Sequence, residues 1–348
     1  MRRIAALLAA CAVICAHALD PVTPGYTLRF PGDRGAHPGF GVEWWYVTGQ
    51  LESPRGPLGF QVTFFRVRNA KADDAPGRFA PRQVLFAHAA LADVRAGRFH
   101  HDQRVGREME GLVEAHTGET DVRIDDWSFV RSAAGYHAEI PGDGFTLALD
   151  LAPTQAVLLE GDRGFSRKGP AEGEASYYYS EPHLQAKGRV RIGAESVDVQ
   201  GEAWLDHEWS SAYLAPGAAG WDWLGANLDD GAALMAFRIR GKDGGAVWAS
   251  ATLRARDGSA RSFGPREVSF LPLRRWRSAA SGVEYPVAMQ VDVAGRRFRL
   301  EPLMDSQELD ARATAGTLYW EGAVRVDGAA SGRGYLELTG YADPLRLP

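Results

Sequence analysis

The chain has 348 residues, of which 45% are hydrophobic, 24% charged and 10% aromatic, and these proportions exclude an intrinsically disordered protein. The 39 Lys and Arg residues against 44 Asp and Glu residues leave a formal net charge of -5, so we expect no nucleic-acid partner. Because single hydrophobic cores stop growing beyond roughly 250–300 residues, the length predicts two domains.

Residues 1–18 have the features of an export signal peptide. Arg2 and Arg3 provide a positive start, an apolar stretch follows, and Ala-His-Ala at residues 16–18 offers the small side chains that a signal peptidase recognises. The stretch is too short to span a membrane as a helix. We therefore expect an exported protein, periplasmic or secreted. The sequence at residues 8–11 also fits a lipoprotein cleavage box, and a lipidated Cys11 would then give peripheral membrane contact.

Both cysteines, Cys11 and Cys15, lie inside this segment, so a mature chain that begins at Leu19 has no thiol. Disulfides, cysteine zinc sites and a cysteine nucleophile are thereby excluded. No His-Glu-x-x-His, phosphate-binding loop or Gly-x-Ser-x-Gly motif is present, and the His100-His101 pair is predicted to lie in a polar turn. We therefore expect neither a metal ion nor a cofactor.

Alternating apolar and polar residues predict β-strands along most of the mature chain, clearest at residues 59–68 and 188–192. Turn-forming groups rich in Gly, Pro and Asp separate the strands, which is typical of an antiparallel sandwich or barrel. Helical spacing is nearly absent, so we expect an all-β protein with few short helices. Further strands are predicted at residues 46–51, 84–94, 121–130, 135–140, 145–151, 196–204, 232–240, 247–254, 287–293, 297–302 and 335–341.

Two segments interrupt this pattern. Residues 160–175 are rich in Gly, Glu, Arg and Lys and are predicted to form a long solvated loop. Residues 211–220 contain Ala, Gly and Pro and are predicted to be a linker. A boundary near residue 212 divides the mature chain into domains at residues 19–212 and 213–348.

Tryptophan is the most unevenly placed residue. Trp204, Trp209, Trp221 and Trp223 fall within twenty positions, and Trp44-Trp45-Tyr46 forms a second cluster. Large rings with one polar edge suit the wall of a pocket for an apolar ligand. The alternative is a core or an interdomain seam packed with indole rings.

Residues 204–209, Trp-Leu-Asp-His-Glu-Trp, place three titratable groups between two indoles. In a pleated strand Asp206 and Glu208 share one face while His207 lies on the other, so we expect a bulge or a strand end here. His207 beside a carboxylate could transfer protons at neutral pH, and a desolvated Asp206 could act as an acid because its pKa would be raised. The alternative is a salt-bridged strand end.

Three other clusters combine rings with polar groups. Trp221-Asp222-Trp223 and Glu43-Trp44-Trp45-Tyr46 each pair an acid with aromatic rings, which is also expected of a hairpin whose acid caps an unpaired N–H. Residues 177–183 add three tyrosines, including Tyr178, and His183. The alternative for this last segment is amphipathic packing at a rim.

In this order the clusters resemble segments of the carotenoid 1,2-hydratase and AttH-like proteins, a lipocalin-like family often described as predicted secreted hydrolases. The resemblance spans nearly the whole mature chain. The matching segments are residues 43–49 with 59–66, Phe86-Ala87-His88, residues 178–180, 201–210, 221–223, 319–322 and 334–341.

The resemblance implies two lipocalin-like antiparallel β-barrel domains packed side by side, with an aromatic-walled cavity. Hydratases of this family protonate a terminal isoprenoid double bond and add water to the carbocation without a cofactor, and aromatic faces attract that positive charge. The family motif of a His two residues before a Trp matches His207 and Trp209. The proton donor stays open among Asp206, Asp222 and Glu208.

The sequence therefore predicts an exported protein that encloses an apolar, isoprenoid or lipid-like molecule, with acid–base chemistry as one possibility. The alternatives are a non-catalytic lipid carrier or accessory factor of an envelope ABC transport system, and a glycan-binding module. No hydrolase nucleophile is present. The candidate catalytic residues are Asp206, His207, Asp222 and Glu208, and the candidate ligand-binding residues are Glu43, Trp44, Trp45, Tyr46, His88, Tyr178, Trp204, Trp209, Trp221 and Trp223.

Overall fold

The computed structural model describes residues 19–77, 79–212 and 214–345, so the predicted signal peptide and both cysteines lie outside the described residues. Within these ranges the chain forms 23 strands and two 3-10 helices, η1 (Gly32–Arg34) and η2 (Ala70–Ala72). All strand pairs are antiparallel. The all-β prediction is therefore confirmed. Neither short helix in the described ranges is long and apolar enough to cross a membrane.

The first sheet has 13 strands in the order β4-β3-β2-β1-β13-β12-β9-β8-β7-β6-β5, with β10 and β11 also paired to β12. It curls around an apolar core that includes Trp45, Phe60, Phe129 and Leu147. Its strands are β1 (Val42–Ser53), β2 (Gly56–Arg68), β3 (Gln83–Asp93), β4 (Arg98–Arg107), β5 (Val113–Ala115), β6 (Asp121–Ile124), β7 (Trp127–Ser132), β8 (Gly135–Gly142), β9 (Phe145–Ala152), β10 (Leu158–Leu159), β11 (Phe165–Arg167), β12 (Ala175–Ile192) and β13 (Glu195–Ala212).

The second sheet has 10 strands in the order β17-β16-β15-β14-β23-β22-β20-β19-β18, with β21 also paired to β22. It curls around its own core, which includes Leu224, Tyr285, Phe298 and Trp320. Its strands are β14 (Ala218–Leu228), β15 (Ala233–Gly241), β16 (Ala246–Arg254), β17 (Ala260–Phe263), β18 (Val268–Arg277), β19 (Glu284–Val293), β20 (Arg296–Pro302), β21 (Glu308–Ala311), β22 (Thr317–Gly328) and β23 (Gly332–Leu338).

Two local expectations are wrong. Residues 160–175 are not a solvated loop, because β11 lies within them and Glu160, Ser166 and Lys168 are buried. The His100-His101 pair lies in β4 rather than in a turn. In both places the charged side chains indicate a solvent-exposed loop or turn. They can also lie on a strand whose polar face is covered by tertiary contacts, and the structure has this arrangement.

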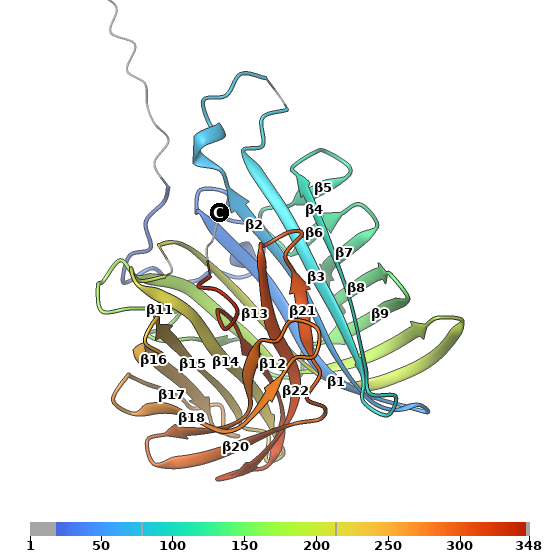
Figure 1. Cartoon of the computed structure of the whole chain (residues 1–348). Helices are drawn as coiled ribbons and strands as arrows, with labels where there is room; N and C mark the ends of the chain where they lie inside the picture. Colours follow the sequence, from blue (N-terminus) through green and yellow to red (C-terminus); the bar gives the residue numbers. More distant parts are fainter. Residues whose placement is uncertain (1–18, 78, 213, 346–348) are drawn as a thin grey trace, which may run out of the picture.

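The two curled sheets lie side by side (Figure 1), with the middle strands of one against the middle strands of the other. β1 contacts β23, β12 and β13 contact β14, and β2 contacts β22. Gln50 Nε2 bridges the sheets by donating to the carbonyl oxygens of Val324 and Gly334, each at 2.9 Å. Because each sheet fills its own interior with apolar side chains, a ligand cavity has to form between the sheets.

Candidate functional site

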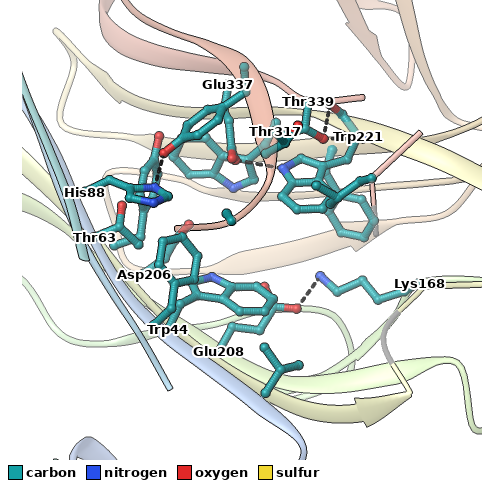
Figure 2. Close-up of a pocket in the computed structure, with 18 of the residues that line it drawn as sticks. Trp44, Thr63, His88, Lys168, Asp206, Glu208, Trp221, Thr317, Glu337 and Thr339 are labelled. Atoms are coloured by element: carbon teal, nitrogen blue, oxygen red, sulfur yellow. Dashed lines mark hydrogen bonds and ion pairs between the residues drawn. The ribbon is translucent and has the colours of Figure 1, made fainter. Parts of the chain in front are cut away.

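A cavity that opens to solvent lies between the two sheets. Figure 2 shows Trp44, Asp206 and Glu208 of the first sheet facing Trp221, Glu337 and Thr339 of the second. Most of the remaining wall is aromatic or aliphatic. The candidate residues that line the cavity are Trp44, Tyr46, His88, Tyr178, Asp206, Glu208, Trp221 and Trp223.

Strand register explains which candidates reach the cavity. Tyr46 pairs with Asp206 and Trp44 with Glu208, so these four side chains share the face that looks toward the second sheet. His207 pairs with Trp45 on the opposite face. The bulge expected at residues 204–209 is absent from the pairing of β13 with β1, and the register shifts of β13 against β12 lie at the ends of this segment, between Ala203 and Leu205 and between Trp209 and Ala212.

Asp206 is the most enclosed acid of the cavity wall. Its Oδ1 accepts hydrogen bonds from Trp204 Nε1 and Ser180 Oγ, each at 2.6 Å, and its Oδ2 accepts one from Tyr178 Oη at 2.6 Å. Trp223 Nε1 donates to the same Tyr178 oxygen at 3.0 Å. Burial raises the pKa of Asp206 to about 7, against the opposing effect of these hydrogen bonds. Asp206 is therefore suited to exchange a proton near neutral pH.

Trp204 contributes to the site through its ring nitrogen, since it does not line the cavity itself. Its ring meets that of Trp223 edge to face across the two sheets, with centroids 6.4 Å apart. Gly225 makes this contact possible, because a Cβ there would lie 2.5 Å from the Trp223 ring and 3.0 Å from Trp204. The two indoles thereby fix the position of Asp206 and Tyr178.

Glu208 forms an ion pair with Lys168, a residue that is not among the candidates predicted from the sequence. Lys168 Nζ lies 2.8 Å from Glu208 Oε1, and both side chains are almost fully buried. The ammonium group also lies over the rings of Tyr178 and Phe237, at 4.7 and 4.1 Å from the centroids. The ion pair with Lys168 fixes the position of Glu208 at the cavity wall. Lys168 is not a sequence-predicted candidate, because residues 160–175 are predicted to form a solvated loop.

Glu337 is a second acid of the cavity, partly buried on the wall formed by the second sheet. Trp221 Nε1 donates to its Oε2 at 2.7 Å, and burial raises the pKa of Glu337 to about 8. Leu336 and Leu338 flank this residue in the predicted strand 335–341, and such alternation predicts a solvent-exposed face for Glu337. The local sequence therefore contains no signal for its place in the cavity wall.

His88 holds the two sheets together at the cavity edge. Its Nδ1 lies 2.5 Å from Tyr319 Oη, and its Nε2 lies 2.7 Å from Thr314 Oγ1. Thr314 Oγ1 donates to Gln103 Oε1, so His88 Nε2 carries the hydrogen and Nδ1 accepts from Tyr319. Burial lowers the pKa of His88 to about 3, so the ring is neutral and positions the wall.

Four candidates on the opposite face lie away from the cavity. Glu43 Oε1 is 2.7 Å from His37 Nδ1 and 2.9 Å from His207 Nε2, while its Oε2 is 2.7 Å from Arg66 Nε. Trp45 and Trp209 stack beside these imidazoles. His207 therefore does not reach the cavity, and the expected approach of its ring to the acid pair is wrong.

The cluster of His37, Glu43 and His207 is also where a metal ion would find ligand atoms, since three of them lie within 4.8 Å of one another. Glu43 however uses both oxygens, one for the two imidazoles and one for Arg66 and the His37 N–H. A metal ion would have to displace these hydrogen bonds and share its carboxylate with a guanidinium group. The arrangement fits a buried hydrogen-bond network that fixes residues 33–37 to β1 and β13.

Asp222 likewise points away from the cavity. It forms ion pairs with Arg238 and, at 2.9 Å, with Arg240, and it accepts a hydrogen bond from Tyr341 Oη at 2.9 Å. Two guanidinium groups stabilise the ionised carboxylate. The structure thereby removes Asp222 from the candidate proton donors, because it lies on the face of β14 opposite Trp221 and Trp223.

The sequence model of the AttH-like family matches residues 21–341. The chain belongs to the AttH-like family. A crystal structure of a candidate AttH from Nitrosomonas europaea shares 54% identity with this AttH-like chain at a TM-score of 0.87, covering 93% of this chain and 100% of that one.

Two more distant structures share the fold. Kievitone hydratase from Nectria haematococca has 15% identity and a TM-score of 0.69, covering 94% of this chain and 98% of that one. CghA with Sch210972 has 17% identity and a TM-score of 0.56, covering 94% and 97%. The predicted lipocalin-like pair of antiparallel sheets is confirmed. Among curated proteins, no sequence matches this chain.

Two cavity acids predict an unusual dependence of stability on pH. Asp206 and Glu337 stay protonated in the folded state at pH values where the unfolded chain has released those protons, since burial raises their pKa to about 7 and about 8. The folded state then binds more protons between the unfolded values of about 4 and these folded values, so the contribution of both acids to the free energy of unfolding should be lost as pH rises from about pH 5 to about pH 8. Urea unfolding at both pH values measures this change. Glu337→Gln should make the fall smaller, and an equal fall in the variant would contradict the assignment.

Proposed function

We propose that this AttH-like protein binds an apolar, unsaturated molecule in the cavity between its sheets and adds water to a carbon–carbon double bond. The observation that carries the proposal is Asp206, an enclosed acid with a pKa of about 7 in a wall of aromatic rings. Such an acid is protonated in part of the molecules at neutral pH and can protonate a weak base.

The proposed reaction has two steps. Asp206 gives its proton to one carbon of the double bond and becomes a carboxylate, while the positive charge develops on the neighbouring carbon. The faces of Trp44, Tyr178 and Trp223 stabilise that charge through their quadrupoles. A water molecule then forms the new C–O bond and releases one proton to Glu208, which Lys168 holds in place through an ion pair. Solvent exchange returns the enzyme to its starting charge.

The ligand class follows from the wall chemistry. Phe65, Phe86 and Ile239 line the cavity together with the indoles, so an isoprenoid or lipid-like chain fits better than a sugar, which needs exposed hydrogen-bonding groups. The name of kievitone hydratase, a protein of the same fold, supports water addition as the reaction type. Export into the periplasm or medium belongs to the same proposal and rests on residues 1–18 alone.

The first experiment is purification of the protein from its native envelope, followed by solvent extraction and mass spectrometry. A co-purifying unsaturated lipid or isoprenoid would identify the ligand class. Incubation of that compound with the protein in ¹⁸O-labelled water should yield a product heavier by one labelled water. A bound lipid that never gains water would contradict the hydratase proposal and favour a carrier, the role expected of an accessory factor in envelope lipid transport.

Trp44→Ala should weaken binding of an apolar probe such as 1-anilinonaphthalene-8-sulfonate by about tenfold or more, because the variant loses one aromatic wall of the cavity. A fluorescence titration measures the change in Kd. Trp276→Ala is the matched control, since Trp276 packs on the core of the second sheet and does not line the cavity. Equal losses in both variants would show that the probe does not bind at the cavity.

A further inference from the structure

A second buried carboxyl lies directly behind Asp206 and does not line the cavity. Glu160 follows β10, and its side chain is fully enclosed. Ser180 Oγ lies 2.9 Å from Glu160 Oε1 and 2.6 Å from Asp206 Oδ1, and Ser180 is itself fully buried on β12. A single hydroxyl group therefore joins the two carboxyls.

The number of hydrogens available to Ser180, Glu160 and Asp206 determines which carboxyl is protonated. A hydroxyl group has one hydrogen, so Ser180 can donate to only one of its two carboxyl neighbours, and the other contact needs a hydrogen from a carboxyl. Asp206 accepts two further hydrogen bonds, from Trp204 and Tyr178, so both of its oxygens already act as acceptors. When Asp206 is ionised, the shared hydrogen therefore belongs on Glu160, which donates to Ser180, and Ser180 in turn donates to Asp206.

The surroundings of Glu160 agree with this assignment. Burial and the Asp206 charge raise the pKa of Glu160 to about 8, against the opposing effects of the hydrogen bonds with Thr252 and Ser180 and of the Lys168 charge. A neutral Glu160 at pH 7 avoids two adjacent negative charges in a low-dielectric site. The titratable and charged groups that act on this pair from the elements around it are Lys168, Tyr178, Glu208, Arg254 and Glu337.

Glu160 is also close to the surface on its other side. Its chain neighbours Leu159 and Gly161 line a surface groove together with Thr252 and Arg254 of β16. The side chain of Thr252 lies beside the Glu160 carboxyl, and Thr252 Oγ1 is 3.5 Å from the hydroxyl of Ser262, which also lines the groove. Glu160 therefore stands between the solvent of this groove and the acid of the cavity.

We propose that Glu160 and Ser180 form a proton relay that reloads Asp206 from the groove. After Asp206 has given its proton to a ligand, the Ser180 hydrogen moves to Asp206 Oδ1 and the Glu160 hydrogen moves to Ser180 Oγ. Two O–H bonds break and two form, and Glu160 is left as the carboxylate. It then takes a proton from groove water beside Thr252. The inference rests on the proposed role of Asp206 as the cavity acid.

The relay is tested first without any ligand. Carbon-13 NMR of the protein labelled at Asp and Glu carboxyls follows each titration, with Glu160→Gln and Asp206→Asn used to assign the two signals. We expect Glu160 to be protonated at pH 7, and the Asp206 titration to shift by about one pH unit in Ser180→Ala and in Glu160→Gln, because each change removes one half of the coupled pair.

Ser176→Ala is the matched control for the serine. Ser176 is fully buried on the same strand, and its hydroxyl contacts the carbonyl of Ser166 instead of a carboxyl. It should leave both titrations unchanged. Should Ser180→Ala fail to fold, Glu160→Gln still tests the coupling, since it keeps the serine. The relay would be overturned if Glu160 were ionised at pH 7. It would also be overturned if the Asp206 titration were the same in the wild type, in Ser180→Ala and in Glu160→Gln.

Turnover of the extracted ligand separates the two proposals. With a working relay, Ser180→Ala and Glu160→Gln should lower kcat about tenfold at pH 8 with KM unchanged, and the loss should shrink toward pH 6, where solvent protons are more abundant. If Asp206→Asn abolishes turnover while both relay variants keep the kcat and pH profile of the wild type, the hydratase proposal stands and the relay falls. Coupled titrations without turnover in any variant would leave the proton pair intact and refute the hydratase proposal.

Discussion

Replacement of Asp206 by Asn should lower the rate of water addition by roughly 10²–10⁴-fold, the usual contribution of a general acid, while ligand retention stays close to that of the wild type. Asn keeps the size of the side chain and can still accept from Trp204 and Ser180, but it has no proton to give at neutral pH. Labelled-water incorporation measures the rate, and extraction of the washed complex measures retention. Unchanged turnover in Asp206→Asn would show that the acid lies elsewhere.

Glu337→Gln is the matched comparison, because Glu337 is the other cavity carboxyl whose pKa burial raises above neutral. It lies on the opposite wall and contacts Trp221, without a link to Ser180 or Glu160. We expect this variant to keep most of its turnover. If Glu337→Gln abolished turnover and Asp206→Asn did not, the proton donor would be on the wall formed by the second sheet.

Replacement of Glu43 by Ala should lower the free energy of unfolding by about 3–5 kcal/mol, the cost of leaving a buried charge without its partner. Glu43 and Arg66 are almost completely enclosed, and the variant would also remove the acceptor shared by His37 and His207. Urea unfolding at neutral pH measures the change. Because the cluster lies on the far face of β1 and β13, the purified variant should still bind the apolar probe.

The surface contact between His137 and Glu139 provides the control for this prediction. Its nitrogen–oxygen distance is 3.7 Å and both side chains are about half exposed. Glu139→Ala should therefore change stability by less than about 1 kcal/mol. Equal effects of Glu43→Ala and Glu139→Ala would contradict a buried network at residues 37, 43, 66 and 207.

The same network predicts how acid acts on the protein. Arg66 and His37 hold the pKa of Glu43 well below its usual value of 4.5, so its stabilisation is present above that pH and is lost as pH falls through the folded pKa. Burial lowers the pKa of His207 below 6.5, so protonation of the unfolded chain also weakens folding as pH falls below that value. The pKa of His37 is raised by Glu43, so its contribution is present below pH 6.5 and is lost as pH rises.

The alternation of side chains along a single strand is enough to predict which residues of the site share a face. A strand at residues 204–209 puts Asp206 and Glu208 on one face and His207 and Trp209 on the other, and β13 has this arrangement. The expectation of a bulge at the three titratable groups failed because it assumed that they act at one place. The two faces of β13 instead have different surroundings. Asp206 and Glu208 face the cavity, and His207 and Trp209 face the interior of the first sheet.

The sequence by itself determined the all-β class, the antiparallel strand pattern and the aromatic segments that carry the family resemblance, because these depend on local period and composition. Only the tertiary structure decided which acids lie close together. Glu160 and Lys168 come from the segment that folds onto β12, Glu337 comes from the second sheet, and only the tertiary structure brings them to Asp206 or to the cavity beside it. Burial is what raises the pKa of these acids, and burial by a distant segment leaves no mark in the local sequence.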